Sequence, residues 1–151
     1  MQELDRLKKA FARLEPLGLR VDGIDHEPVM GSFKPHALVT AAIAGRALDL
    51  VVEVRRFLRP TMLGSLIMQL KRYENAADLP RPARGLLVAD HVTPQMADSL
   101  REQDVFFADT AGNAYINAPP VYLFIKGERP AKPSHLEAYQ GRAFRSSGLQ
   151  V

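Results

Sequence analysis

The stretch Ala47–Phe57, ALDLVVEVRRF, decides the fold, because it alternates like a β-strand yet carries charged side chains inside an apolar run. Successive residues of a strand point to opposite faces of a sheet, so Glu53 and Arg55 are neighbours on one face. Acidic and basic residues two apart on a strand are commonly a structural pair on a partly covered face. The stretch therefore predicts a strand and leaves open whether its charged pair is structural or functional.

The sequence on either side of this strand predicts the rest of a mixed sheet. Residues 36–57 have the pattern of two strands joined in an antiparallel hairpin, and Pro60 suits the first turn of a following helix. Residues 85–90 form the nearly all-apolar run expected of a central strand. We also expect a helix over residues 3–15, a first strand over 19–28, a helix over 93–103 and strands between 105 and 127. This order predicts an α/β fold with helices flanking a mixed sheet.

Composition limits the class of protein. The chain has 151 residues, of which 46% are hydrophobic, and this is enough for one globular domain. We expect that domain over residues 1–127 and a tail or linker over 128–151. The absence of cysteine excludes disulfides and thiolate metal sites. No apolar run approaches the roughly 20 residues that span a bilayer, and the N-terminus lacks the apolar core of a secretory signal, so we expect a cytoplasmic protein.

Positive charge is concentrated in one part of the chain. The net charge is only +3, but residues 55–84 hold seven basic residues and two acidic ones. Such asymmetry is typical of a basic patch for a polyanion, and a solvated surface is the alternative. If the strand end and the next helix adjoin, their basic side chains converge on phosphates, and Arg81 and Arg84 extend the patch. The expected DNA-binding residues are Arg55, Arg56, Arg59, Lys71 and Arg72.

A nuclease site is one function that the charged strand suggests. Divalent-metal nucleases hold Mg²⁺ with carboxylates and use a cation to orient the water and balance the phosphate. A Glu and a Lys two apart on a strand place both on one face, but here the second residue is Arg55. Arginine does not deprotonate to activate a water, and its planar guanidinium binds phosphate instead.

Three segments resemble parts of two known families. The sequence LVVEVRRFLRPTMLGSLIMQLKRY resembles the core of restriction-endonuclease-like, PD-(D/E)xK proteins, and Gln69 and Tyr73 resemble their Gln-x-x-x-Tyr helix motif. The sequence LLVADHVTPQMADSLREQDVFFADTAGNAYI is similar to the AbiEi-type antitoxins and transcriptional regulators of type IV toxin–antitoxin systems. The C-terminal GRAFRSSGLQV resembles the link into the winged-helix domain that such proteins carry next.

The resemblance implies an incomplete nuclease site. It places Glu53 at the acidic, metal-binding position, Arg55 at the Lys position, and Gln69 and Tyr73 at the helix positions. The usual Asp would fall near His36, yet no carboxylate occurs from residue 33 to 48. Asp49 lies about 13 Å along the strand from Glu53, which is too far to share a metal. Asp22 or Asp25 would serve only if the early loop packs beside the hairpin.

A turn motif near the C-terminal strands allows two interpretations. Asp109, Gly112 and Asn113 are turn formers, with Asp109 placed to cap the turn amides and Tyr115 to pack beneath it. The first interpretation is a tight structural turn; the second is a functional loop at the strand ends, near the candidate site. The four histidines have no paired spacing, so a zinc site is not expected.

Three functions follow from these patterns. The first is a non-catalytic nuclease-fold domain of an AbiEi-like antitoxin or regulator, with DNA and a cognate toxin as partners and no cofactor or membrane. The second is an active nuclease that needs Mg²⁺, with Glu53 and an acid from the region of Asp22 to Asp25. The third is a protein-interaction or dimerisation module without a role in DNA binding.

Overall fold

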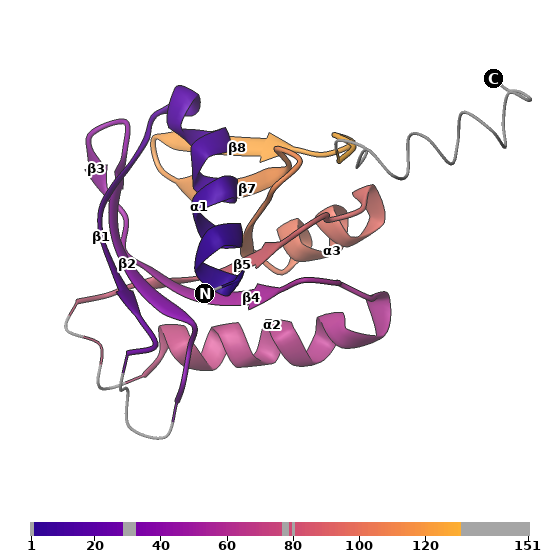
Figure 1. The fold of residues 1–151 in the computed structure, drawn as a ribbon, viewed down its shortest axis with the longest axis horizontal. Helices are drawn as coiled ribbons and strands as arrows, with labels where there is room; N and C mark the ends of the chain where they lie inside the picture. Colours follow the sequence, from indigo (N-terminus) through magenta and orange to yellow (C-terminus); the bar gives the residue numbers. More distant parts are fainter. Residues whose placement is uncertain (1, 29–32, 77–78, 80, 131–151) are drawn as a thin grey trace, which may run out of the picture.

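An eight-stranded mixed sheet forms the centre of the molecule in the computed structural model, which describes residues 2–28, 33–76, 79 and 81–130 (Figure 1). The helices are α1 (Gln2–Leu14), α2 (Pro60–Glu74) and α3 (Pro94–Glu102), with a short 3₁₀ turn η1 (Glu15–Leu17) after α1. The strands are β1 (Leu19–His26), β2 (Ala37–Ile43), β3 (Arg46–Ala47), β4 (Leu50–Arg55), β5 (Arg84–Ala89), β6 (Phe106–Asp109), β7 (Ala114–Ala118) and β8 (Val121–Ile125).

The sheet has a parallel centre and antiparallel flanks. Its strand order is β1-β2-β4-β5-β6-β7-β8, with the two-residue β3 paired to β2. Strands β4, β5 and β6 run parallel, whereas β1, β2 and β4 pair antiparallel, as do β6, β7 and β8. The predicted fold class, a mixed α/β sheet with flanking helices, is confirmed by this topology.

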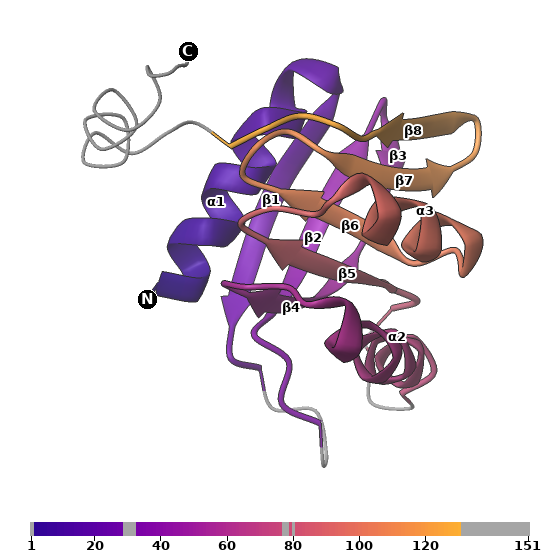
Figure 2. The ribbon, with the colours of Figure 1, turned by 90° about the vertical axis from the view of Figure 1, so that its right-hand side faces the viewer.

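The helices cover both faces of the sheet because the central strands are apolar on both faces. Strands β4, β5 and β6 are buried along almost their whole length. Figure 2 shows α1 on one face, with α2 and α3 on the other. Helix α2 lies close against β5 because Gly85 has no side chain; a Cβ there would stand 2.9 Å from the Cβ of Leu70.

The predicted first strand is confirmed as β1, and its pairing is irregular where the strand pattern of the sequence is weakest. Its register with β2 shifts between Val21 and Gly23, next to Asp22. The hairpin between β2 and β4 turns at Ala44 and Gly45, both of which have positive φ. The expected tail lies outside the described residues from 131 onward. Within the described part of the chain, no helix has both the length and the apolar character needed to cross a membrane.

Candidate functional site

The buried carboxylate of Glu53 is the centre of the candidate site. Glu53 lies in β4, is 4% exposed, and faces α2. Its Oε2 accepts a 2.5 Å hydrogen bond from the Arg55 guanidinium, and its Oε1 accepts one of 3.1 Å from the Tyr73 hydroxyl. The Gln69 side-chain amide donates to the same hydroxyl over 2.8 Å. A continuous series of hydrogen bonds thus links the four residues that the sequence proposed as a nuclease site.

Helix geometry explains why α2 supplies two of these residues. Gln69 and Tyr73 are four apart, so they lie one above the other on the same side of α2. Burial raises the pKa of the Tyr73 phenol to about 12, and the neighbouring charge and hydrogen bond of Glu53 act in the same direction. The hydroxyl therefore keeps its proton at neutral pH and serves as a hydrogen-bond donor to Glu53. Phe33 packs edge-on against the Tyr73 ring, with 5.6 Å between the ring centroids.

His36 occupies the place where the resemblance expects a second carboxylate. It directly precedes β2, and its Nδ1 lies 3.7 Å from Oε2 of Glu53. The same Nδ1 accepts a 2.9 Å hydrogen bond from the Val54 amide. Because that lone pair is used by an amide, Nδ1 carries no proton and does not donate to Glu53. His36 and Glu53 are therefore polar neighbours, and Nδ1 of His36 forms no ion pair with the carboxylate.

Among the described residues, the other acidic side chains do not complete a metal site with Glu53. Asp49 pairs with Arg81 at 2.8 Å, and Asp22 pairs with Arg20 at the same distance. Asp25 stands opposite Leu38 in β2, two strands away from β4. Over residues 2–28, 33–76, 79 and 81–130, no group of three or more His, Asp or Glu side chains is placed to hold a metal ion. These donors do not fit Mg²⁺, which prefers several oxygen ligands.

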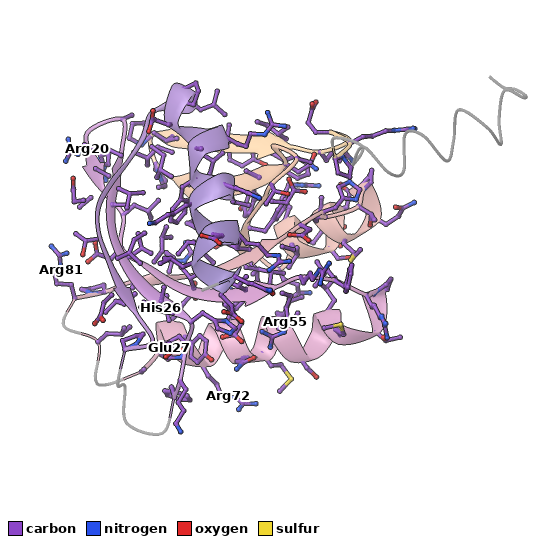
Figure 3. All side chains as sticks on the ribbon, in the orientation of Figure 1. Arg20, His26, Glu27, Arg55, Arg72 and Arg81 are labelled. Atoms are coloured by element: carbon purple, nitrogen blue, oxygen red, sulfur yellow. The ribbon has the colours of Figure 1, made fainter. Side chains whose placement is uncertain are left out.

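The backbone of Glu27 contacts His36 from outside the expected motif. The amide of Glu27 donates to the His36 carbonyl over 2.8 Å, and the Glu27 side chain is exposed beyond the end of β1 (Figure 3). No sequence signal marked His36 as a neighbour of Glu53, although the expected Asp would fall near this position.

The basic residues separate into two groups and do not form a single patch. Arg56 and Arg59 are exposed between β4 and α2, whereas Arg72 is exposed near the other end of α2, about 20 Å further along the helix. Figure 3 shows Arg55 between β4 and α2 and Arg72 on the outer side of α2. Lys71 points elsewhere, because its ammonium reaches the Asp104 carbonyl at 3.5 Å. The prediction that all five basic side chains converge is wrong, because the 15-residue helix α2 separates the arginines before it from Lys71 and Arg72 in its last turn.

Arg81 and Arg84 do not extend the patch, because both are held in ion pairs. Arg81 pairs with Asp49 at 2.8 Å. Arg84 bridges Glu74 at 2.9 Å and Asp104 at 3.0 Å, and its guanidinium lies 4.1 Å from the Phe106 ring centroid. The two ion pairs of Arg84 join β5 to α2 and to the segment after α3.

The turn after β6 is organised by the carboxylate of Asp109. This residue is 1% exposed and accepts hydrogen bonds from the amides of Val92, Ala111 and Asn113 and from the Asn113 side chain. Gly112 supplies the positive φ, at 107°. Tyr115 does not pack beneath the turn; its ring contacts Phe106, Tyr122 and Phe124, and its hydroxyl donates to Asp104 over 2.7 Å.

The turn after β6 and the Glu53 site lie at the same end of the sheet, where the parallel strands finish. Arg55, Ala89 and Asp109 share one row across the parallel strands, so the chain leaves β4, β5 and β6 side by side. Arg13 of α1 donates to the carbonyls of Thr110 and Ala111 at 3.1 and 3.0 Å. Helix α1 therefore contacts the segment that follows the carboxyl end of β6.

Comparisons with known proteins find solved structures of distant similarity and assign no function. No protein-family model matches the sequence, and no curated protein does. A repair endonuclease from Pyrococcus abyssi aligns with a TM-score of 0.47 and 16% identity over 72% of this chain, which spans only 45% of that protein. An XisH family protein from Nostoc punctiforme PCC 73102 aligns with a TM-score of 0.40 and 20% identity, covering 66% of this chain and 85% of that one.

A third solved structure is similar to the same degree. The fdxN element excision controlling factor protein from Anabaena variabilis aligns with a TM-score of 0.41 and 16% identity over 67% of this chain and 85% of that chain. At such identities the likeness concerns the fold alone. The antitoxin family suggested by the sequence is not confirmed by these comparisons.

Proposed function

We propose that this chain is a nuclease-fold domain that binds the phosphate backbone of DNA and does not cleave it. The observation that carries the proposal is the engagement of Glu53. Both of its carboxylate oxygens accept hydrogen bonds from protein donors, Arg55 and Tyr73. The neighbouring position holds His36, whose Nδ1 lone pair is taken by the Val54 amide.

This arrangement favours a site that retains the architecture of a nuclease and lacks its metal. A catalytic metal needs free carboxylate oxygens, usually from two acids, at about 2 Å. Here a cation from the same strand takes the place that a metal would occupy, and it neutralises Glu53 inside the protein. Because Arg55 is 28% exposed at its side chain, its outer edge is still open to an incoming phosphate.

The basic residues supply the DNA contacts in this proposal. Arg56 and Arg59 extend from the segment between β4 and α2, and among the described residues neither forms an ion pair. Backbone contacts by exposed arginines give affinity that is sensitive to salt and weakly dependent on sequence. Arg72 adds a separate contact near the other end of α2.

Within an organism, we infer a role in an AbiEi-like antitoxin or transcriptional regulator, with DNA and a cognate toxin as partners. The support is the resemblance of residues 86–116, which the fold arranges as β5, α3, β6 and the start of β7. Co-expression with the product of an adjacent gene tests this role: rescue of cell growth supports an antitoxin, and no effect on any adjacent toxin contradicts it.

The backbone-binding proposal predicts a specific loss in a salt titration. Replacing Arg56 and Arg59 by glutamine removes two phosphate contacts, so the slope of log K against log salt should fall by about 2. Duplex DNA affinity at low salt should fall about tenfold or more. A gel-shift series across salt concentrations measures both.

The matched control replaces Arg46 in β3 and Arg101 in α3, which are exposed and lie away from the β4–α2 segment. This control removes the same charge and should leave the slope nearly unchanged. Equal losses in the two variants would show that net charge alone governs binding. No binding by the native chain at low salt would favour the interaction-module alternative.

A further inference from the structure

An exposed aromatic ring lies next to the arginines of the β4–α2 segment. Phe57 is 66% exposed, and the Arg56 guanidinium lies over its ring at 5.0 Å from the centroid. Single exposed apolar residues are common on protein surfaces and need no explanation by themselves. This ring differs because an arginine holds one face and because the same arginine lines a cleft.

The cleft lies between the first half of α1 and the carboxyl ends of the parallel strands. It has a volume of about 580 Å³, and its walls include Arg6, Lys9, Arg56, Asp90, His91 and Thr110. Ligands of open α/β sheets commonly bind outside the carboxyl ends of the strands. Because Arg56 lines the cleft and also contacts Phe57, the exposed ring stands at the margin of the cleft.

The charges of the cleft favour an anion. Arg6 is fixed by a 2.8 Å ion pair with Asp90, and its side chain is 18% exposed. Across the described part of the chain, no ion pair involves Lys9 or Arg56, so both are open to a ligand. The other acidic side chain of the cleft is Asp5, which among the described residues has no ion pair. Its negative charge disfavours an anion bound close to it.

We propose that the cleft and Phe57 together bind single-stranded nucleic acid, with Lys9 and Arg56 on phosphates and an unpaired base stacked on the Phe57 ring. This inference rests on the proposed DNA binding and specifies the form of the nucleic acid. A positively charged groove beside an exposed aromatic ring is the combination that single-strand-binding proteins use. A duplex hides its base faces in the stack, so it offers phosphates to the arginines and no partner to the ring.

The test compares a single strand with the matching duplex on variants of the full chain. Phe57→Ala should weaken binding of a labelled single-stranded oligonucleotide by about tenfold, measured by fluorescence anisotropy. Binding of the duplex should stay within about twofold, since its contacts are to phosphates. Phe57→Trp, which keeps a stacking surface, should restore single-strand affinity. Because the ring is exposed, none of these changes removes a core contact.

A second pair of variants separates the cleft from the surrounding charge. Lys9→Gln should weaken single-strand binding, whereas Lys8→Gln should not, because Lys8 lines a different groove against β1. If Phe57→Ala leaves single-strand binding unchanged, or weakens duplex and single strand equally, the stacking proposal is wrong although DNA binding stands. If neither form binds at low salt, the proposed function itself fails.

Discussion

Asp109→Ala is expected to lower the free energy of unfolding by about 4 kcal/mol, a large part of the stability of a typical domain. The wild-type carboxylate is 1% exposed and accepts hydrogen bonds from three backbone amides and one side-chain amide. Alanine would leave the three backbone amides buried without acceptors, and each costs about 1–3 kcal/mol when unsatisfied. Equilibrium urea denaturation measures the loss.

The matched control for this prediction is Asp98→Ala. Asp98 is an exposed residue of α3 that pairs with Lys126 at 2.7 Å, and both side chains are more than 40% exposed. Such surface pairs contribute about 0–1 kcal/mol, so the control should unfold nearly as the native chain does. An Asp109→Ala variant within 1 kcal/mol of the native chain, on the scale of that control, would contradict the role given to this carboxylate.

Arg55→Ala is the second change expected to have a large effect, a loss of about 2–3 kcal/mol in the free energy of unfolding. Removing one partner of a buried pair leaves the other charge unpaired, and Glu53 is 4% exposed. The expected loss is smaller than the roughly 3–5 kcal/mol of a fully buried pair, because the Arg55 side chain is 28% exposed and water partly replaces it. Thermal and urea unfolding of the variant give the measurement.

A double-mutant cycle isolates the cause of that loss. In a Glu53→Gln background no buried charge is left behind, so Arg55→Ala should then cost about 1 kcal/mol or less. A loss of the same size in both backgrounds would mean that Arg55 stabilises the fold through packing and not through Glu53. The cycle also shows whether the pair is the internal neutralising element that the proposed function assumes.

Much of the fold follows from local patterns in the sequence. The apolar run at residues 85–90 and the alternation around Glu53 predict strands, because short runs of these kinds are typical of buried and half-buried strands. Spacings of two on a strand and four on a helix predict that Glu53 pairs with Arg55 and Gln69 with Tyr73. That the two pairs belong to one site was implied by the family resemblance and not by the spacing.

The missing parts depend on contacts that no local pattern records. Lys71 and Arg72 are adjacent in sequence, but the position of α3 decides that Lys71 reaches Asp104 while Arg72 stays exposed. The pairing of Arg84 with Asp104 likewise joins residues that are 20 positions apart. Phe57 reads as part of an apolar strand, and only the end of β4 at Arg55 leaves its ring outside.

The role of His36 is the most instructive of these omissions. A histidine without a paired partner in the sequence carries no signal of a site. Its significance comes from the hydrogen bond between its Nδ1 and the Val54 amide, which places it 3.7 Å from Glu53. The resemblance implies an acid near this position, and His36 does not supply one.

Incubation of the purified chain with supercoiled plasmid and single-stranded DNA, with Mg²⁺ or Mn²⁺ added, tests the central claim most directly. The same samples are analysed for binding by gel shift and for strand breaks on a denaturing gel. We expect DNA that is bound and intact with either metal, because Glu53 is engaged by Arg55 and Tyr73. Metal-dependent cleavage that Glu53→Gln abolishes would contradict the account and make the chain an active nuclease.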